Sequence, residues 1–158
     1  MDEAFIVNLS DAPALSHSRR ATIVTPEPED APWPDTGVNV QIMQPGQPNG
    51  RYHSEPVQED FLVLHGECIV ILEGEERPMR QWDYLHCPPG THHILVGAGE
   101  GPCAILMVGV RSPDATIDYR VVALASKYVA SPPHDTDTPA EAYADQDREY
   151  RPERAPWP

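Results

Sequence analysis

The chain is poor in basic residues and has no long apolar run. It carries 11 lysines and arginines against 25 aspartates and glutamates, a formal net charge of −14 at pH 7. A surface of this sign repels phosphate backbones and anionic lipid headgroups, so we expect neither nucleic acid nor a membrane surface as a partner. The longest apolar runs have the length of a β-strand, and no segment predicts a membrane-spanning helix.

Cysteine is scarce as well. Cys68, Cys87 and Cys103 show no C-x-x-C spacing, and an odd number of cysteines cannot form a complete set of intrachain disulfides. The N-terminus also lacks the basic region and the long apolar stretch of a secretory leader. We therefore expect a cytoplasmic protein whose thiols are reduced and mostly buried.

Proline, by contrast, is abundant. The 19 prolines among 158 residues argue against a mostly helical protein, because proline breaks the interior of a helix. Short β-type segments separated by Gly- or Pro-containing turns instead predict an all-β protein, an antiparallel sandwich or barrel. These segments are residues 38–43, 51–55, 60–64, 68–72, 84–87, 93–96 and 103–110.

The pattern divides the chain into successive parts. Residues 1–35 hold N-terminal strands and a proline-rich connector, and residues 36–113 hold the barrel. Residues 114–130 contain one short helix, indicated by apolar side chains three and four apart. Residues 131–158 are a proline-rich acidic tail with almost no aliphatic side chains, which predicts an extended or disordered segment.

Histidine and glutamate residues in the central part carry the chemical signal. His53 and Glu55 are two residues apart, so on a strand they would point to the same side. Glu59 would enter from the next strand, and His93 from a segment after a Pro-Gly turn. Imidazole and carboxylate groups that converge inside a barrel predict a site for one divalent metal ion.

The same residues lie in two segments that resemble the two sequence motifs of the cupin family. Residues 52–66 resemble motif one, which has two histidines two apart, a glutamate four further on, and a hydrophobic strand that ends at glycine. Residues 82–93 resemble motif two, which ends on a metal-binding histidine. The resemblance covers roughly residues 38–110 and implies a jelly-roll β-barrel with one divalent metal inside.

Carried over position by position, the resemblance places His53 and His93 on histidine ligands and Glu59 on the glutamate ligand. The chain departs from the pattern at Glu55, where most members have the second histidine, and at Trp82, where motif two usually begins with glycine. A carboxylate at position 55 disfavours soft copper(I) and leaves Fe, Zn, Mn and Ni open. Glu55 is either a fourth ligand or, turned aside, a general base beside a face of two histidines and one carboxylate.

We also expect side chains that contact a small-molecule substrate. Strand alternation would put Arg51 on the cavity side, where it would bind a carboxylate substrate or close the barrel mouth through a salt bridge. His92, adjacent to His93, would face the opposite way, toward the surface or an interface. The expected apolar lining is Phe61, Val63, Leu95, Ile105 and Met107, of which Phe61 and Leu95 are the substrate-binding candidates.

Three functions fit this site. The first is a metal-dependent oxygenase of the dioxygenase type, since 3-hydroxyanthranilate dioxygenases among cupins look similar in using a histidine, a glutamate six residues later and a distant motif-two histidine. The second is a metal-dependent isomerase or lyase in which Glu55 shuttles a proton. The third is a non-enzymatic cupin that binds a small molecule. The resemblance also implies a homodimer.

Overall fold

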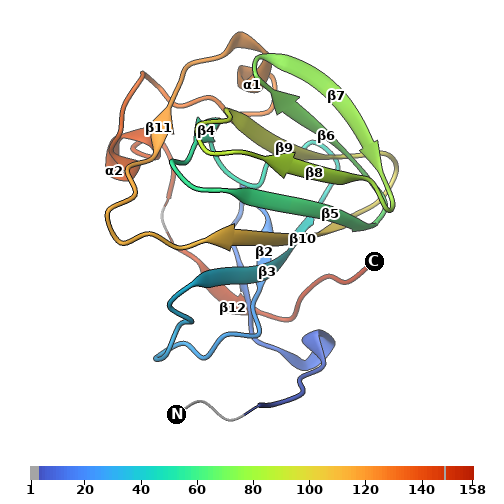
Figure 1. Ribbon diagram of the computed structural model, residues 1–158. Helices are drawn as coiled ribbons and strands as arrows, with labels where there is room; N and C mark the ends of the chain where they lie inside the picture. Colours follow the sequence, from blue (N-terminus) through green and yellow to red (C-terminus); the bar gives the residue numbers. More distant parts are fainter. Residues whose placement is uncertain (1–3, 148) are drawn as a thin grey trace.

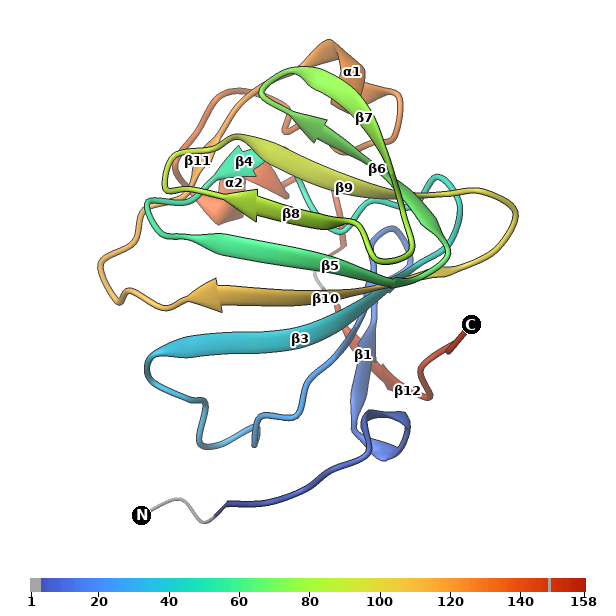
Figure 2. The same ribbon diagram turned by 45° about the vertical axis from the view of Figure 1, so that its right-hand side comes forward.

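The computed structural model describes residues 4–147 and 149–158, which form two antiparallel sheets (Figures 1 and 2). In spatial order, the larger sheet contains β12 (Arg151–Glu153), β1 (Ala14–Ser16), β2 (Thr22–Val24), β3 (Thr36–Met43), β10 (Cys103–Val110), β5 (Glu59–His65) and β8 (Tyr84–Cys87). The smaller sheet contains β11 (Asp118–Tyr119), β4 (His53–Ser54), β9 (His93–Ala98), β6 (Glu67–Leu72) and β7 (Glu75–Arg80). The predicted all-β jelly-roll barrel is confirmed.

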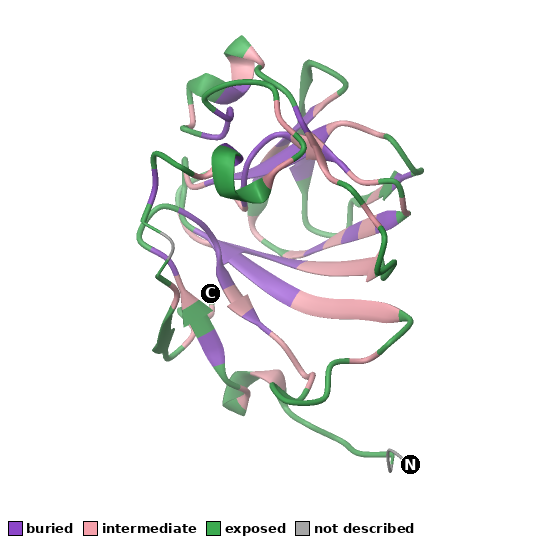
Figure 3. Cartoon of the chain, turned by 90° about the vertical axis from the view of Figure 1, so that its left-hand side faces the viewer, coloured by how far each residue is buried: buried purple, intermediate pink, exposed green. Residues whose placement is uncertain are grey.

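The core lies between the two sheets because side chains alternate along each strand. On β5, Glu59, Phe61 and Val63 are buried while the intervening residues are partly exposed. Leu95 and Ile105 join Phe61 and Val63 in the same apolar cluster, and Met107 packs against it half-buried. The expected apolar lining of the barrel is therefore present, and Figure 3 shows the buried stretches along the strands and the exposed ones on loops and helices.

The three cysteines belong to this core. Cys68, Cys87 and Cys103 are buried and unpaired, as the odd number predicted. Burial raises the pKa of the Cys87 thiol to about 12, and nearby carboxylates add to the shift. These thiols are protonated at neutral pH and serve as small apolar side chains.

Strand β7 was not expected from the sequence. Its residues are charged and exposed apart from Met79, and Pro78 interrupts any apolar alternation. It pairs with β6 over the whole of its length and forms the edge of the smaller sheet. Charged residues and proline are typical of edge strands, which have one unpaired side.

The C-terminal part differs from its predicted form. Helix α1 (Ala123–Ser126) is the short helix predicted within residues 114–130, and Val129 shortly after it has a positive φ of 57°. The tail, predicted to be extended or disordered, carries helix α2 (Pro139–Ala142) and strand β12, which pairs with β1. Trp157 packs against the apolar cluster around β2 and β3. The tail is ordered by contacts with the barrel, because it has no core of its own.

The short helices lie outside the barrel, and α1 packs against Ile71 and Ile94 on the outer face of the smaller sheet. Besides α1 and α2, a 3-10 turn (Leu9–Asp11) precedes β1. In both ribbon views α2 and β11 lie beside β4, at the opposite side of the molecule from the N-terminus (Figures 1 and 2). No helix in the described part of the chain is long and apolar enough to cross a bilayer.

Candidate metal centre

Three predicted ligands converge between the sheets. His53 on β4 lies directly opposite His93 on β9, and Glu59 is the first residue of β5 in the facing sheet. One donor atom from each of the three residues lies within 4.8 Å of the other two. Glu59 is 5% exposed and His93 1% exposed, so the cluster is enclosed by protein.

Backbone carbonyls orient both imidazoles. Nδ1 of His53 is 2.6 Å from the carbonyl oxygen of Arg51, and Nδ1 of His93 is 3.0 Å from that of Thr91. A carbonyl accepts only, so each Nδ1 carries the proton and each Nε2 keeps a free lone pair. Such a bond on the far nitrogen is the usual way in which a protein fixes a metal-binding histidine.

The free Nε2 atoms face carboxylates. Nε2 of His93 is 3.3 Å from Oε2 of Glu59, and Nε2 of His53 is 3.8 Å from Oε1 of Glu55. Burial, together with the nearby His93, lowers the pKa of His53 to about 3, and burial also lowers the pKa of His93. Burial and the Glu55 charge raise the pKa of Glu59 to about 8.

This donor set fits a divalent metal ion. Both imidazoles are neutral, which is the form that binds metals, and their lone pairs point toward carboxylate oxygens. Without a cation, ionising the buried carboxyl group of Glu59 is unfavourable, which is why its pKa is raised. A positive charge among the three donor atoms would offset that cost.

Glu55 lies beside the cluster and outside it. Strand β4 ends at Ser54, so Glu55 does not continue the alternation on which its prediction as a ligand was based. Its side chain is partly exposed and faces a surface cleft of about 430 Å³ between residues 32–34 and 110–115. Burial raises the pKa of its carboxyl group. Both roles considered for Glu55, fourth metal ligand and general base, stay predictions.

Arg51 has a different position from the one that alternation predicted. Strand β4 begins only at His53, so residue 51 is not part of the strand. The guanidinium is 2% exposed and donates to the carbonyls of Val129 and Ser131, and its Nη2 is 2.5 Å from Oδ1 of Asp145. The structure contains a salt bridge between Arg51 and Asp145, and contact with a carboxylate substrate stays a prediction.

The other substrate-binding candidates lie in the barrel core. The Phe61 ring is edge-on to His93, with ring centroids 5.2 Å apart, so Phe61 bounds the metal site directly. Leu95 is fully buried two residues along β9 from His93, on the same inner face. Contact with a substrate stays a prediction for both.

Tyr119 is a site residue that the sequence did not reveal. It lies opposite His53 in the β11–β4 pair, and the two ring centroids are 5.7 Å apart. It is 4% exposed, and burial, Tyr143 and Glu55 raise its pKa above the ordinary value. Because β11 contains only Asp118 and Tyr119, it is too short to give a periodic pattern.

Comparison with known proteins agrees with this architecture. A family model described as the cupin domain matches residues 39–109. The chain is 33% identical over 92 residues to 3-hydroxyanthranilate 3,4-dioxygenase from Ruegeria pomeroyi, a match that covers 54% of this chain and 49% of that protein. The chain thus spans about half the length of the curated relative that it matches.

Solved structures show the same fold at low sequence identity. The polyketide cyclase RemF from Streptomyces resistomycificus superposes with a TM-score of 0.61 at 16% identity, covering 72% of this chain and 84% of that one. A sugar phosphate isomerase of the cupin superfamily from Silicibacter pomeroyi gives a TM-score of 0.56 at 23% identity, covering 68% and 73%. With two antiparallel sheets, a candidate triad between them and a family-model match over residues 39–109, that part of the chain is a cupin domain.

Proposed function

We propose that this chain is a mononuclear metal-dependent enzyme of the dioxygenase type that acts on a small organic molecule. The observation that carries the proposal is the convergence of His53, Glu59 and His93 within 4.8 Å. Two imidazoles and one carboxylate are the donor set of non-haem iron oxygenases. The partial match to a dioxygenase from Ruegeria pomeroyi supports the same class of reaction.

A bound divalent metal would supply Lewis-acid or redox chemistry at this triad. His53 and His93 would hold it as neutral ligands fixed through Nδ1, while Glu59 would balance one positive charge. Phe61 and the core around it would keep bulk water from the inner side. Glu55, which faces the surface cleft, would take up or release a proton at its carboxylate.

A metal-dependent isomerase or lyase is the second candidate, and the position of Glu55 favours it. A half-buried carboxyl group with a raised pKa, 3.8 Å from Nε2 of His53, suits proton transfer to and from substrate carbon. Such a reaction would require no oxygen. The two candidates therefore share a metal site and differ in whether the reaction consumes O₂.

Metal content is the first test. We expect about one equivalent of divalent metal in the wild-type protein and its loss in His93→Ala, because three protein ligands are the usual minimum for a catalytic metal site. His65→Ala removes an exposed histidine at the end of β5 and serves as the matched control that keeps the metal. Absence of metal from wild type, even after reconstitution, would contradict both candidates.

Oxygen uptake then separates the candidates. The protein is reconstituted anaerobically with Fe²⁺ and assayed against catechol-like, β-diketone and thiol substrates. Oxygen consumption that is lost in His93→Ala supports the dioxygenase. Turnover without oxygen in a zinc- or manganese-loaded protein supports the isomerase or lyase, and metal binding without any turnover supports a binding protein.

A further inference from the structure

Tyr119, His53 and His93 form a row across three neighbouring strands. Tyr119 on β11 lies opposite His53 on β4, which lies opposite His93 on β9. Directly opposed residues of an antiparallel pair share one face of the sheet. The centroid distances, 5.7 Å between Tyr119 and His53 and 5.1 Å between the histidines, agree with this geometry. The tyrosine therefore contacts the metal site from the inner face of the smaller sheet.

The hydroxyl group of Tyr119 is open to a ligand. The residue as a whole is 4% exposed, and no hydrogen bond joins its hydroxyl to another described residue; the oxygen is also not one of the buried polar atoms without a partner, so it reaches open space. The ring packs against His53, so a phenol oxygen that is open at this position can be reached by a molecule bound beside the triad. At neutral pH a phenol is a hydrogen-bond donor, which suits an oxygen acceptor.

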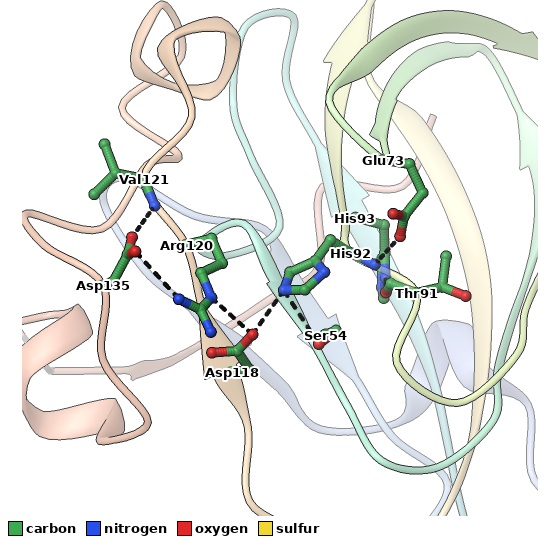
Figure 4. Close-up of polar contacts among 9 residues, drawn as sticks. All are labelled: Ser54, Glu73, Thr91, His92, His93, Asp118, Arg120, Val121 and Asp135. Carbon is green, nitrogen blue, oxygen red and sulfur yellow. Dashed lines mark hydrogen bonds and ion pairs between the residues drawn. The ribbon is translucent and has the colours of Figure 1, made fainter.

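A set of polar side chains on the outer face holds β11 in place (Figure 4). Asp118 lies opposite Ser54, and Nε2 of His92 is 2.9 Å from Oδ2 of Asp118 and 3.3 Å from Oγ of Ser54. Arg120 donates through Nε to Asp118 at 2.9 Å and through Nη1 to Asp135 at 3.2 Å. As alternation predicted, His92 faces away from His93.

These contacts are a structural clamp and not a catalytic triad. Ser54 and Asp118 bind the same nitrogen of His92, whereas a serine–histidine–aspartate relay uses the two different ring nitrogens. A strand of two residues gains little from backbone pairing alone, so side-chain bonds decide where it lies. The clamp, defined as Ser54, His92 and Asp118, fixes the position of the neighbouring Tyr119.

We propose that Tyr119 is a substrate-binding residue whose phenol donates a hydrogen bond to an oxygen atom of the substrate. The inference rests on the proposed function for the metal site and adds a substrate class: a small chelating molecule with a second oxygen acceptor, such as a catecholate, an enolate or a hydroxy-carbonyl compound. The clamp of Ser54, His92 and Asp118 positions Tyr119 without touching the substrate.

The probe for the test is 4-nitrocatechol, a chelator whose visible absorption changes when it binds a metal. Cobalt-loaded wild type and Tyr119→Phe are titrated with it, and the metal content of each is measured. Phenylalanine keeps the ring that packs against His53 and Tyr143, and circular dichroism checks the fold. We expect equal metal content and roughly tenfold or more weaker binding, since a hydrogen bond to a charged oxygen is lost. Tyr84→Phe, at an exposed site on β8, should bind as wild type.

The outcomes distinguish this inference from the proposed function. Equal affinity in wild type and Tyr119→Phe at equal metal content would overturn the role of Tyr119 and leave the proposed function intact. Metal-loaded wild type that binds no probe would overturn the inferred substrate class. Wild type that takes up no metal would overturn the proposed function and the inference together.

Asp118→Asn tests the clamp and keeps the phenol. We expect weaker probe binding than in wild type, because β11 is no longer held by an ionised partner of His92 and Arg120. The double variant Asp118→Asn/Tyr119→Phe should bind no more weakly than Tyr119→Phe alone, since the clamp acts through the phenol. Additive losses would show that Asp118 affects the site by another route and would overturn its positioning role.

Discussion

Each imidazole of the triad is oriented by the main chain. The carbonyls of Arg51 and Thr91 accept the Nδ1 protons of His53 and His93, so both Nε2 atoms are directed into the site before any ion binds. No side-chain substitution at positions 51 or 91 removes these bonds directly. Main-chain carbonyls at the strand ends therefore hold both histidines in place before metal binds. The energetic cost of burying an ionisable group in this site falls on Glu59.

Glu59→Gln should change how the stability of the metal-free protein depends on pH. Burial raises the pKa of Glu59 to about 8 from 4.5, so its contribution to stability is complete below pH 4.5 and is lost as the pH rises through 8. Glutamine cannot ionise and avoids this loss. In thermal unfolding with a chelator between pH 5 and 9, the melting temperature of the variant should rise relative to that of wild type as the pH rises. The expected size is about 2–4 °C for each kcal/mol of difference in the free energy of unfolding.

A control and a second condition sharpen this measurement. Glu75→Gln, at an exposed position on β7, should leave the pH dependence of wild type unchanged. With metal bound, wild type should be more stable than the variant. Metal binding stabilises the folded wild type, and the variant has lost the Glu59 carboxylate that would bind the metal. Parallel stability curves for the metal-free proteins would contradict the assignment of a buried, costly carboxylate to Glu59.

The residues of the triad were predictable, and their neighbours were less so. His53, Glu59 and His93 follow from ligand type and motif spacing. Arg51 and Glu55 were assigned by strand alternation, and β4 spans only residues 53 and 54, so neither residue lies in the strand, although Glu55 still faces His53. The length of so short a strand is set by tertiary contacts that leave no periodic signal.

At the scale of elements, most strands were predictable from apolar alternation, and β7 was not. Its pairing with β6 depends on backbone bonds and leaves nearly all of its side chains in solvent. Helix α1 is the short helix predicted within residues 114–130, and its Ala125 packs in a cluster with Ile71 and Ile94. The strand that was missed is a segment whose form is decided by its neighbour more than by local composition.

The turn between β7 and β8 contains a strained residue. Trp82 has φ of 75°, a conformation that favours glycine, at the position where cupin motif two usually has glycine. Its side chain is 68% exposed and contributes little burial. Trp82→Gly should therefore raise the free energy of unfolding by about 1 kcal/mol, seen as a higher urea midpoint with an unchanged slope.

Trp82→Ala separates the backbone from the side chain in this experiment. Alanine removes the indole and keeps the strain of a positive φ, so it should give no gain. A loss of stability in both variants would show that the indole makes a stabilising contact and would contradict the strain assignment.

At the scale of the whole molecule, Arg51 joins the C-terminal part of the chain to the barrel. Its guanidinium donates to the carbonyls of Val129 and Ser131 and to the carboxylate of Asp145, and its backbone N–H donates to the hydroxyl oxygen of Tyr143. The tail was predicted to be extended or disordered, and its order comes from these contacts and from β12 pairing with β1. Composition alone does not report such contacts.

Arg51→Met should release this segment. Buried carbonyls lose their donors, so we expect destabilisation by at least about 2 kcal/mol and faster amide hydrogen exchange over residues 129–147. Metal content should stay at one equivalent, because the backbone carbonyl that orients His53 remains. Arg77→Met removes an exposed ion pair on β7 and should change neither measurement. Unchanged exchange over the segment in Arg51→Met would contradict the role of Arg51.

Strand β11 lies outside the part of the chain that matches the cupin domain. The cupin-domain match ends at residue 109, and it includes His53, Glu59 and His93, whereas Tyr119 and its neighbour Asp118 come later. On the roles proposed above, the metal ligands and the phenol that binds the substrate are encoded in different stretches of sequence. Recombination or design that exchanges the stretch after residue 113 between related chains could change which molecule is accepted while the ion and its three ligands are inherited intact.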